Sequence, residues 1–253
     1  MVDSRYLSRL EAYYRAFNGR QEEAYLACFH PEASLGGSFT GSEASGVGVQ
    51  RAILRSSIGA MGDMTMVPDR FYQAQDEVAV AWVGAVTGLG GHRASVQGIT
   101  LFAFDGEARI RRCRVFWDPR ILSGPSHGEA VNPSHLAAIE AYYSAFNTRD
   151  WTGVSGLLSE GSLLGGTLVG PGFSGGPSLR SVFEATLARL PGIRMRPGQA
   201  YQAQDEVALH WEGRAQDRNG TLRPIEGLAI FRFDGAGGIT RYRTYWNPLP
   251  LLQ

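Results

Sequence analysis

The sequence predicts two tandem copies of an α+β domain within its 253 residues. The octapeptide YQAQDEVA occurs unchanged at residues 72–79 and 201–208, which places the two copies 129 residues apart. Inside each copy, apolar residues at helical spacing come first and β-rich runs follow. Helices followed by consecutive strands, without alternation between the two, are typical of an α+β fold with an antiparallel sheet.

Other segments repeat at the same offset along nearly the whole chain. They are EAYYRAFN at 11–18 against EAYYSAFN at 140–147, FAFDG at 102–106 against FRFDG at 231–235, and RCRVFWDP at 112–119 against RYRTYWNP at 241–248. A repeat of about 120 residues has an ordinary domain size and is too long for a solenoid unit. We therefore expect one domain over residues 1–122, a linker rich in Pro, Gly and Ser over 123–133, and a second domain over 134–253.

Three helices are predicted at the start of each copy. The first is marked by apolar residues at helical spacing, which are Leu7, Leu10, Tyr14 and Phe17, and in the second copy Leu136, Ile139, Tyr143 and Phe146. A shorter helix is expected over 21–29 and 151–158, and a third over 49–61 and 178–190. In the first copy, β-rich runs then predict strands over 64–75, 78–87, 96–104 and 110–117, separated by turn residues.

The composition excludes several classes of partner. Acidic and basic residues number 24 each and form no block of one sign, which argues against nucleic acid or a membrane surface. A small, uncharged partner fits this balance better. The five histidines are scattered and have no close cysteine or carboxylate set, so we expect no metal and no other cofactor.

Cysteine usage and the N-terminus bear on the compartment. Cys28 and Cys113 have no counterparts in the second copy, so a shared disulfide framework is not expected and a reducing compartment is the default. The N-terminal segment has no apolar signal core, and no apolar run approaches a membrane span. We expect a cytoplasmic protein.

The order of elements and several quoted segments resemble the SnoaL-like branch of the nuclear transport factor two-like superfamily. The segments are AYYRAFN near the start, the DEVAVAW hairpin, FAFDG and the terminal FWDP. The resemblance implies two α+β cones of the cystatin-like roll type, each with three N-terminal helices packed on a curved antiparallel sheet around one deep apolar pocket. Two copies in one chain imply a pseudodimer whose domains pair through their sheets, similar to the fused epoxide hydrolases of polyether biosynthesis, which would allow the chain to be monomeric.

The resemblance also assigns candidate catalytic positions. Tyr13 and Tyr142 match the oxyanion-binding tyrosine of ketosteroid isomerase, whereas its general-base aspartate falls at Gly37 and Gly166. Because the second acid of that enzyme is also missing, neither copy is expected to be a ketosteroid isomerase. The positions that limonene epoxide hydrolase uses hold apolar residues in the first copy, but Glu212, Arg214 and Thr244 in the second.

One strand differs between the copies in a way that needs no knowledge of the family. Ala81, Val83 and Ala85 of the first copy are replaced by His210, Glu212 and Arg214 of the second copy. A period of two places the three polar residues on one face of the strand. If that face lines the pocket, His210 is the base, Glu212 is its partner or the acid, and Arg214 orients the substrate. If it faces solvent, they are ordinary surface residues.

Other residues complete the set of candidates. Tyr142 is expected to donate a hydrogen bond to developing negative charge, or alternatively to pack the core with its hydroxyl bonded to the backbone. Asp118 is a catalytic candidate whose alternative is a turn or interface group. Substrate contacts are expected, besides Arg214, from the residues Tyr13, Trp117, Tyr242, Thr244 and Trp246.

The leading functional hypothesis is a cofactor-independent cyclase or isomerase, or an epoxide-opening enzyme, of secondary metabolism. It would act by acid/base catalysis on an apolar polyketide- or terpenoid-like substrate, because an apolar pocket shifts pKa values and holds a flexible substrate in a reactive conformation. We expect the second copy to hold the active pocket and the first to be structural or a hydrocarbon template. The alternatives are a non-catalytic protein that binds an apolar ligand or acts as a scaffold, and regulatory oligomerisation through the sheets.

Overall fold

The computed structural model describes residues 2–61, 64–87, 91, 93–123 and 131–251. The chain divides into two compact units, Met1–Gly128 and Glu129–Gln253. The expected linker over 123–133 falls mainly on residues 124–130, which lie outside the described residues, and the first helix of the second unit already begins at Pro133. Pairing of the two sheets within the chain stays a prediction.

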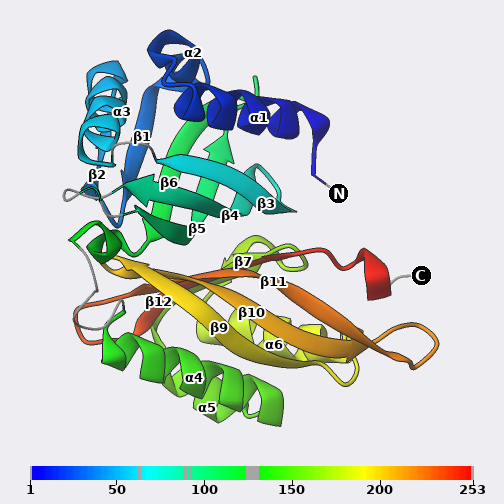
Figure 1. Cartoon of the computed structure of the whole chain (residues 1–253). Coiled ribbons are helices and arrows are strands. Elements are labelled where there is room, and N and C mark those ends of the chain that lie inside the picture. The colour runs from blue at the N-terminus through cyan, green and yellow to red at the C-terminus, as the bar shows by residue number, and fades with distance from the viewer. Residues whose placement is uncertain (1, 62–63, 88–90, 92, 124–130, 252–253) are drawn as a thin grey trace. The chain divides into compact units, whose positions relative to one another are not determined.

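Each unit contains the same succession of elements (Figure 1). The first unit consists of α1 Ser4–Asn18, α2 Glu22–Leu26, β1 Phe29–Gly37, β2 Gly41–Ser45, α3 Val47–Met61, β3 Thr65–Ala74, β4 Glu77–Thr87, β5 Arg93–Phe104, β6 Ile110–Trp117 and the 3-10 helix η1 Pro119–Ser123. The second consists of α4 Pro133–Thr148, α5 Trp151–Gly156, β7 Leu158–Gly166, β8 Gly170–Ser174, α6 Gly176–Arg189, β9 Arg194–Ala203, β10 Glu206–Gln216, β11 Leu222–Phe233, β12 Ile239–Trp246 and η2 Leu249–Leu251. The predicted helices and strands of the α+β fold are confirmed.

The long first helix of each unit begins at a side-chain cap. Asp3 accepts a hydrogen bond from the backbone nitrogen of Arg5 at 2.8 Å, and Asn132 accepts one from that of Ser134 at 2.9 Å. Such caps satisfy backbone donors that have no partner within the helix. Pro133 in the first turn of α4 adds a preorganised φ without removing a needed donor.

The sheets are mixed, which corrects the prediction of a wholly antiparallel sheet. The strand order is β2-β1-β6-β5-β4-β3 in the first unit and β8-β7-β12-β11-β10-β9 in the second. The pairs β1–β6 and β7–β12 are parallel, and all other neighbours in the order are antiparallel. The strands β1, β2, β7 and β8 were not predicted, because their glycine-rich sequences lack the alternation that marks a half-buried strand.

The repeated octapeptide forms the end of a hairpin in both units. β3 ends at Ala74 and β4 begins at Glu77, so the turn contains only Gln75 and Asp76. Gln75 and its counterpart Gln204 have φ values of 57° and 56°. The identical sequences therefore form the same turn, which lies one residue earlier than the predicted strand bounds of 64–75 and 78–87 placed it.

The helices of each unit cover one face of its sheet (Figure 1), and the core lies between them. In the second unit, Tyr142 and Tyr143 of α4 pack in the same buried cluster as Leu209 and Trp211 of β10. The face of β10 that carries Leu209 and Trp211 is therefore the inner face. Within the described part of the chain, no helix is both long enough and apolar enough to cross a membrane.

Candidate functional site

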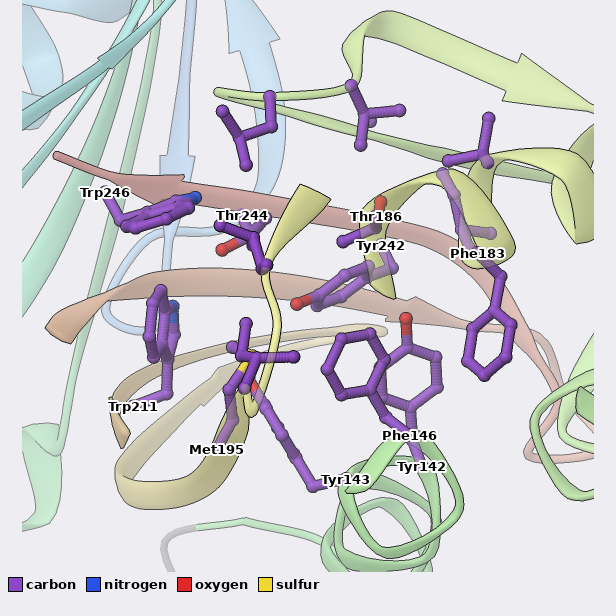
Figure 2. A pocket seen from close by; sticks show the side chains of 17 residues that line it. Tyr142, Tyr143, Phe146, Phe183, Thr186, Met195, Trp211, Tyr242, Thr244 and Trp246 are labelled. Carbon is purple, nitrogen blue, oxygen red and sulfur yellow. The ribbon is translucent and has the colours of Figure 1, made fainter. Parts of the chain in front are cut away.

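The second unit contains a cavity between its helices and the inner face of its sheet (Figure 2). Together with its open mouth the empty space amounts to about 680 Å³. The lining residues share an apolar or aromatic character, with a few hydroxyl and N–H groups, and are Tyr142, Tyr143, Phe146, Leu164, Gly165, Leu168, Val169, Val182, Phe183, Thr186, Leu190, Ile193, Met195, Trp211, Tyr242, Thr244 and Trp246. We call this space the second cavity.

Aromatic contacts hold one wall of the second cavity in place. The ring of Tyr142 lies 4.9 Å from that of Tyr242 and 5.5 Å from that of Phe231, measured between centroids. At the other end, the rings of Trp211 and Trp246 meet edge to face at 5.9 Å. Contacts of this kind add stability beyond the area they bury, so these rings form a fixed surface rather than a loose filling.

The tyrosines of the second cavity are hydrogen-bond donors and not bases. Burial raises the pKa of Tyr142 and Tyr143 well above its usual value, and raises that of Tyr242 to about 12. The hydroxyls of Thr244 and Tyr143 lie near that of Tyr242 and oppose the rise of its pKa, without reaching hydrogen-bond geometry. All three phenols therefore stay protonated near neutral pH.

Three buried polar atoms around this cavity lack a partner among the described residues. They are the Nε1 of Trp211, the hydroxyl oxygen of Tyr143 and the Oγ1 of Thr244. Buried polar groups in native proteins nearly always have a hydrogen-bond partner, so each exception calls for an explanation. Figure 2 shows the Thr244 hydroxyl directed toward the end of the cavity where Trp211 and Trp246 lie.

The first unit has a similar cavity with a different chemistry. Its empty space, again counted with the mouth, is about 510 Å³, and its lining includes Tyr13, Cys113, Val115 and Trp117. Burial raises the pKa of the Cys113 thiol to about 12, so this group is neutral as well. At the positions where the second cavity has Tyr242 and Thr244, the first cavity thus has a thiol and a methyl-bearing side chain.

A pair of facing residues on neighbouring strands accounts for part of this difference. In the first unit, Thr100 of β5 lies opposite Val115 of β6, and the Thr100 hydroxyl accepts a hydrogen bond from Trp82 Nε1 at 3.0 Å. In the second unit the corresponding pair is Ala229 opposite Thr244. The threonine hydroxyl is therefore on β5 in the first unit and on β12 in the second. The equivalent tryptophan of the second unit, Trp211, has no acceptor among the described residues.

Glycine occupies the position of the isomerase general base for a steric reason. At Gly166, which has a φ of 138°, a Cβ atom would lie 2.2 Å from the carbonyl oxygen of Thr244. At Gly37, which has a φ of 150°, it would lie 2.1 Å from that of Val115. With this backbone neither position can carry a carboxylate, since any side chain begins with a Cβ.

The expectation that His210, Glu212 and Arg214 line the pocket is wrong. They alternate with Leu209 and Trp211 along β10, which belong to the core, and none of the three is among the described lining residues. Glu212 is exposed and forms an ion pair with Arg196 of β9 at 2.8 Å. In the first copy both faces of this strand are rich in apolar residues, so the period of two could not tell which face the helices cover.

Asp118 is also placed away from the cavities. It follows β6 and receives two hydrogen bonds from the Arg120 guanidinium, at 2.7 and 2.8 Å, and it is not among the described lining residues. These bonds lower the pKa of the Asp118 carboxyl below its usual value. The structure favours the predicted alternative of a turn group.

Most of the other predicted site residues do line a cavity. Tyr142, Tyr242, Thr244 and Trp246 lie in the lining of the second cavity, and Tyr13 and Trp117 in that of the first. Tyr143 and Trp211 also line the second cavity but were not predicted as site residues. The signal for Trp211 was its size, because the face of a strand that carries a tryptophan in both copies is the one most in need of burial.

The profile of the SnoaL-like domain matches the chain twice, over residues 10–113 and 139–242. The chain belongs to the SnoaL-like domain family. The predicted resemblance is thus confirmed in both copies. No match to this SnoaL-like protein was found among curated proteins.

Solved structures similar to this SnoaL-like protein each cover about half of it. TerC, crystallised with polyporic acid, is 21% identical with a TM-score of 0.44, covering 47% of this chain and 96% of its own. A protein of unknown function from Burkholderia pseudomallei is 20% identical with a TM-score of 0.43, with coverages of 46% and 92%. The epoxide hydrolase/cyclase-like enzyme SalBIII of salinomycin pyran ring formation is 24% identical with a TM-score of 0.41, with coverages of 44% and 89%.

Proposed function

We propose that the second unit binds a small, largely apolar molecule, of polyketide- or terpenoid-like character, in the second cavity. The observation that carries this proposal is the lining, which combines aromatic and aliphatic side chains with a few convergent hydroxyl and N–H groups. Apolar walls with a small number of placed polar groups are typical of small-molecule sites. The first cavity lacks the hydroxyls of Tyr242 and Thr244, so we assign it a structural role.

An acid/base pair within the second cavity is not part of this proposal. Among its described lining residues there is no carboxylate, imidazole or amine. The phenols are held protonated by burial, and His210 and Glu212 lie on the opposite face of β10. Binding of an apolar molecule, the alternative considered from the sequence, therefore becomes the leading function.

The test uses indane, a bicyclic hydrocarbon, as a probe with a pair of matched variants. Val182 lines the second cavity and its counterpart Ile53 lines the first, so Val182→Phe fills one cavity and Ile53→Phe the other. We expect Val182→Phe to weaken indane binding at least tenfold in an NMR titration, whereas Ile53→Phe leaves it within about twofold. Equal binding by both variants, or loss only in Ile53→Phe, would overturn the proposal.

Catalysis of cyclisation, isomerisation or epoxide opening is a second candidate function. It is favoured by the phenol hydroxyls of Tyr142 and Tyr242, which burial keeps as donors able to stabilise negative charge that develops on a substrate oxygen. With 1,2-epoxyindane as the probe, this function requires hydrolysis above the rate in buffer. Tyr142→Phe or Tyr242→Phe should then lower the rate without a matching loss of indane binding.

A further inference from the structure

We infer that the second cavity receives an oxygen atom of its ligand, a carbonyl or ether oxygen, between the Trp211 indole N–H and the Thr244 hydroxyl. This inference rests on the proposed function, because it names the chemical class of the molecule that the second cavity binds. It specifies one acceptor on an otherwise apolar skeleton.

The indole of Trp211 is a fixed and unused donor. The residue is only 1% exposed, it lines the second cavity, and its Nε1 has no partner among the described residues. Gly227 of β11 lies directly opposite Trp211, and a Cβ there would come within 2.7 Å of the indole Cζ2. The indole thus lies over Gly227, in space that a Cβ would occupy, and this packing helps to fix the direction of its N–H.

The hydroxyl of Thr244 supplies the second group. Its backbone is held on both sides, by pairing with Ala229 of β11 and with Gly166 of β7. Its Oγ1 is buried and has no partner at hydrogen-bond geometry in the described part of the chain, and Figure 2 shows it directed toward the tryptophan end of the cavity. A threonine hydroxyl can donate as well as accept, so it can bind the same ligand oxygen as the indole.

The first unit provides an internal comparison for the inferred ligand oxygen. There the equivalent indole, Trp82, donates to Thr100 at 3.0 Å, so the same tryptophan is satisfied within the protein. The second unit keeps the tryptophan and the glycine beneath it but carries Ala229 where the acceptor was. A buried donor without an acceptor is costly unless something else supplies the acceptor. A ligand oxygen in the second cavity would do so.

The ligand class follows from the kinds of group present. Both groups can donate, so an acceptor such as a ketone, quinone or ether oxygen fits. An anion is disfavoured, because no cationic side chain is among the described lining residues. The remaining aromatic and aliphatic lining requires the rest of the molecule to be apolar.

The experiment compares 1-indanone with indane, which differ by one carbonyl oxygen, in the intact chain. Dissociation constants are measured by NMR titration, together with the indole N–H resonance of Trp211, assigned by its absence in Trp211→Phe. The test variant is Ala229→Thr/Thr244→Val, which gives the second unit the pair found in the first. The control is Thr100→Ala/Val115→Thr, which makes the reverse exchange in the first unit.

We expect the preference for 1-indanone over indane to fall about three- to tenfold in Ala229→Thr/Thr244→Val, and to stay unchanged in the control. In the wild type, 1-indanone should move the Trp211 N–H resonance downfield and indane should not. Binding of both probes with no change in preference and no such shift would overturn the inference alone. Failure of indane and 1-indanone to bind would overturn the proposed function with it. Should the double variant not fold, Thr244→Val and the wild-type resonance still decide.

Discussion

The two cavities of this protein have the same architecture but satisfy their polar groups differently. In the first unit, the indole N–H of Trp82 donates a hydrogen bond to the Thr100 hydroxyl, so this indole is not available to a ligand. In the second, Ala229 and Thr244 leave the corresponding tryptophan without a partner among the described residues. The two copies thus differ in one buried indole donor, which has an acceptor within the protein in the first unit and none among the described residues in the second. We take unused donors, and not the size of the cavity, as the mark of the functional copy.

The largest effect is expected where the two copies are alike. Gly166→Ala should lower the free energy of unfolding by about 3 kcal/mol, because the new Cβ would meet the Thr244 carbonyl oxygen at 2.2 Å in a backbone conformation that L side chains rarely adopt. Gly37→Ala should cost about the same. Gly156→Ala, which has open space around its Cβ, is the control. Urea unfolding measures all three, and a neutral Gly166→Ala would contradict the steric account.

The pH dependence of stability should distinguish the buried groups of the two cavities. The pKa of Cys113 is raised from 9.0 to about 12, and that of Tyr242 from 10.0 to about 12. In each case the group loses its proton at a lower pH in the unfolded chain than in the folded one. Its contribution to stability is therefore complete below the pKa of the unfolded state and falls as the pH rises toward the pKa of the folded state. The loss approaches about 1.4 kcal/mol per pH unit for each group.

The thiol should therefore begin to weaken the protein about one pH unit earlier than the phenol does. Burial also raises the pKa of Cys28, which acts in the same direction. Urea unfolding of the wild type at pH 8, 9 and 10 should show a decline that Cys28→Ala/Cys113→Ala reduces. The same decline in wild type and variant would show that the thiols do not titrate as described.

A smaller effect compares the two threonines directly. Thr100→Val removes the acceptor of Trp82 and leaves a buried N–H unpaired, which should cost about 2 kcal/mol of unfolding free energy. Thr244→Val removes a hydroxyl that reaches hydrogen-bond geometry with none of the described residues, so we expect a change within about 0.5 kcal/mol. Thermal and urea unfolding measure both variants. Equal costs would remove the contrast on which the choice of the second cavity depends.

The smallest effect is expected on the outer face of β10. His210→Ala and Glu212→Gln should leave the indane dissociation constant within about twofold, because neither side chain is among the described residues that line the second cavity. The ion pair of Glu212 with Arg196 is exposed, and exposed pairs contribute little to stability. A large loss of binding in either variant would return these residues to the functional site.

The sequence was a good guide where periodicity and repetition carry the information. Two matching copies placed every α-helix and four of the six strands of each sheet, because amphipathic spacing and β-rich runs reflect which side chains must be buried. The same criteria could not find β1 and β7. Glycines such as Gly37 and Gly166 are required there because the backbone of a parallel neighbouring strand lies too close for a Cβ, and that strand is far away along the chain.

The candidate site shows the same division. From the sequence, Tyr142 and Thr244 could be placed at the second pocket because they match site positions of similar enzymes, and Tyr242 and Trp246 belong to the same segment as Thr244. The sequence also determined that the copies had diverged on β10, but it could not say which face of that strand the helices cover. Only the tertiary structure showed that His210 and Glu212 lie on the face of β10 that points away from the second cavity. It also showed that the Trp211 N–H lacks an acceptor, because hydrogen-bond pairing depends on which strands become neighbours.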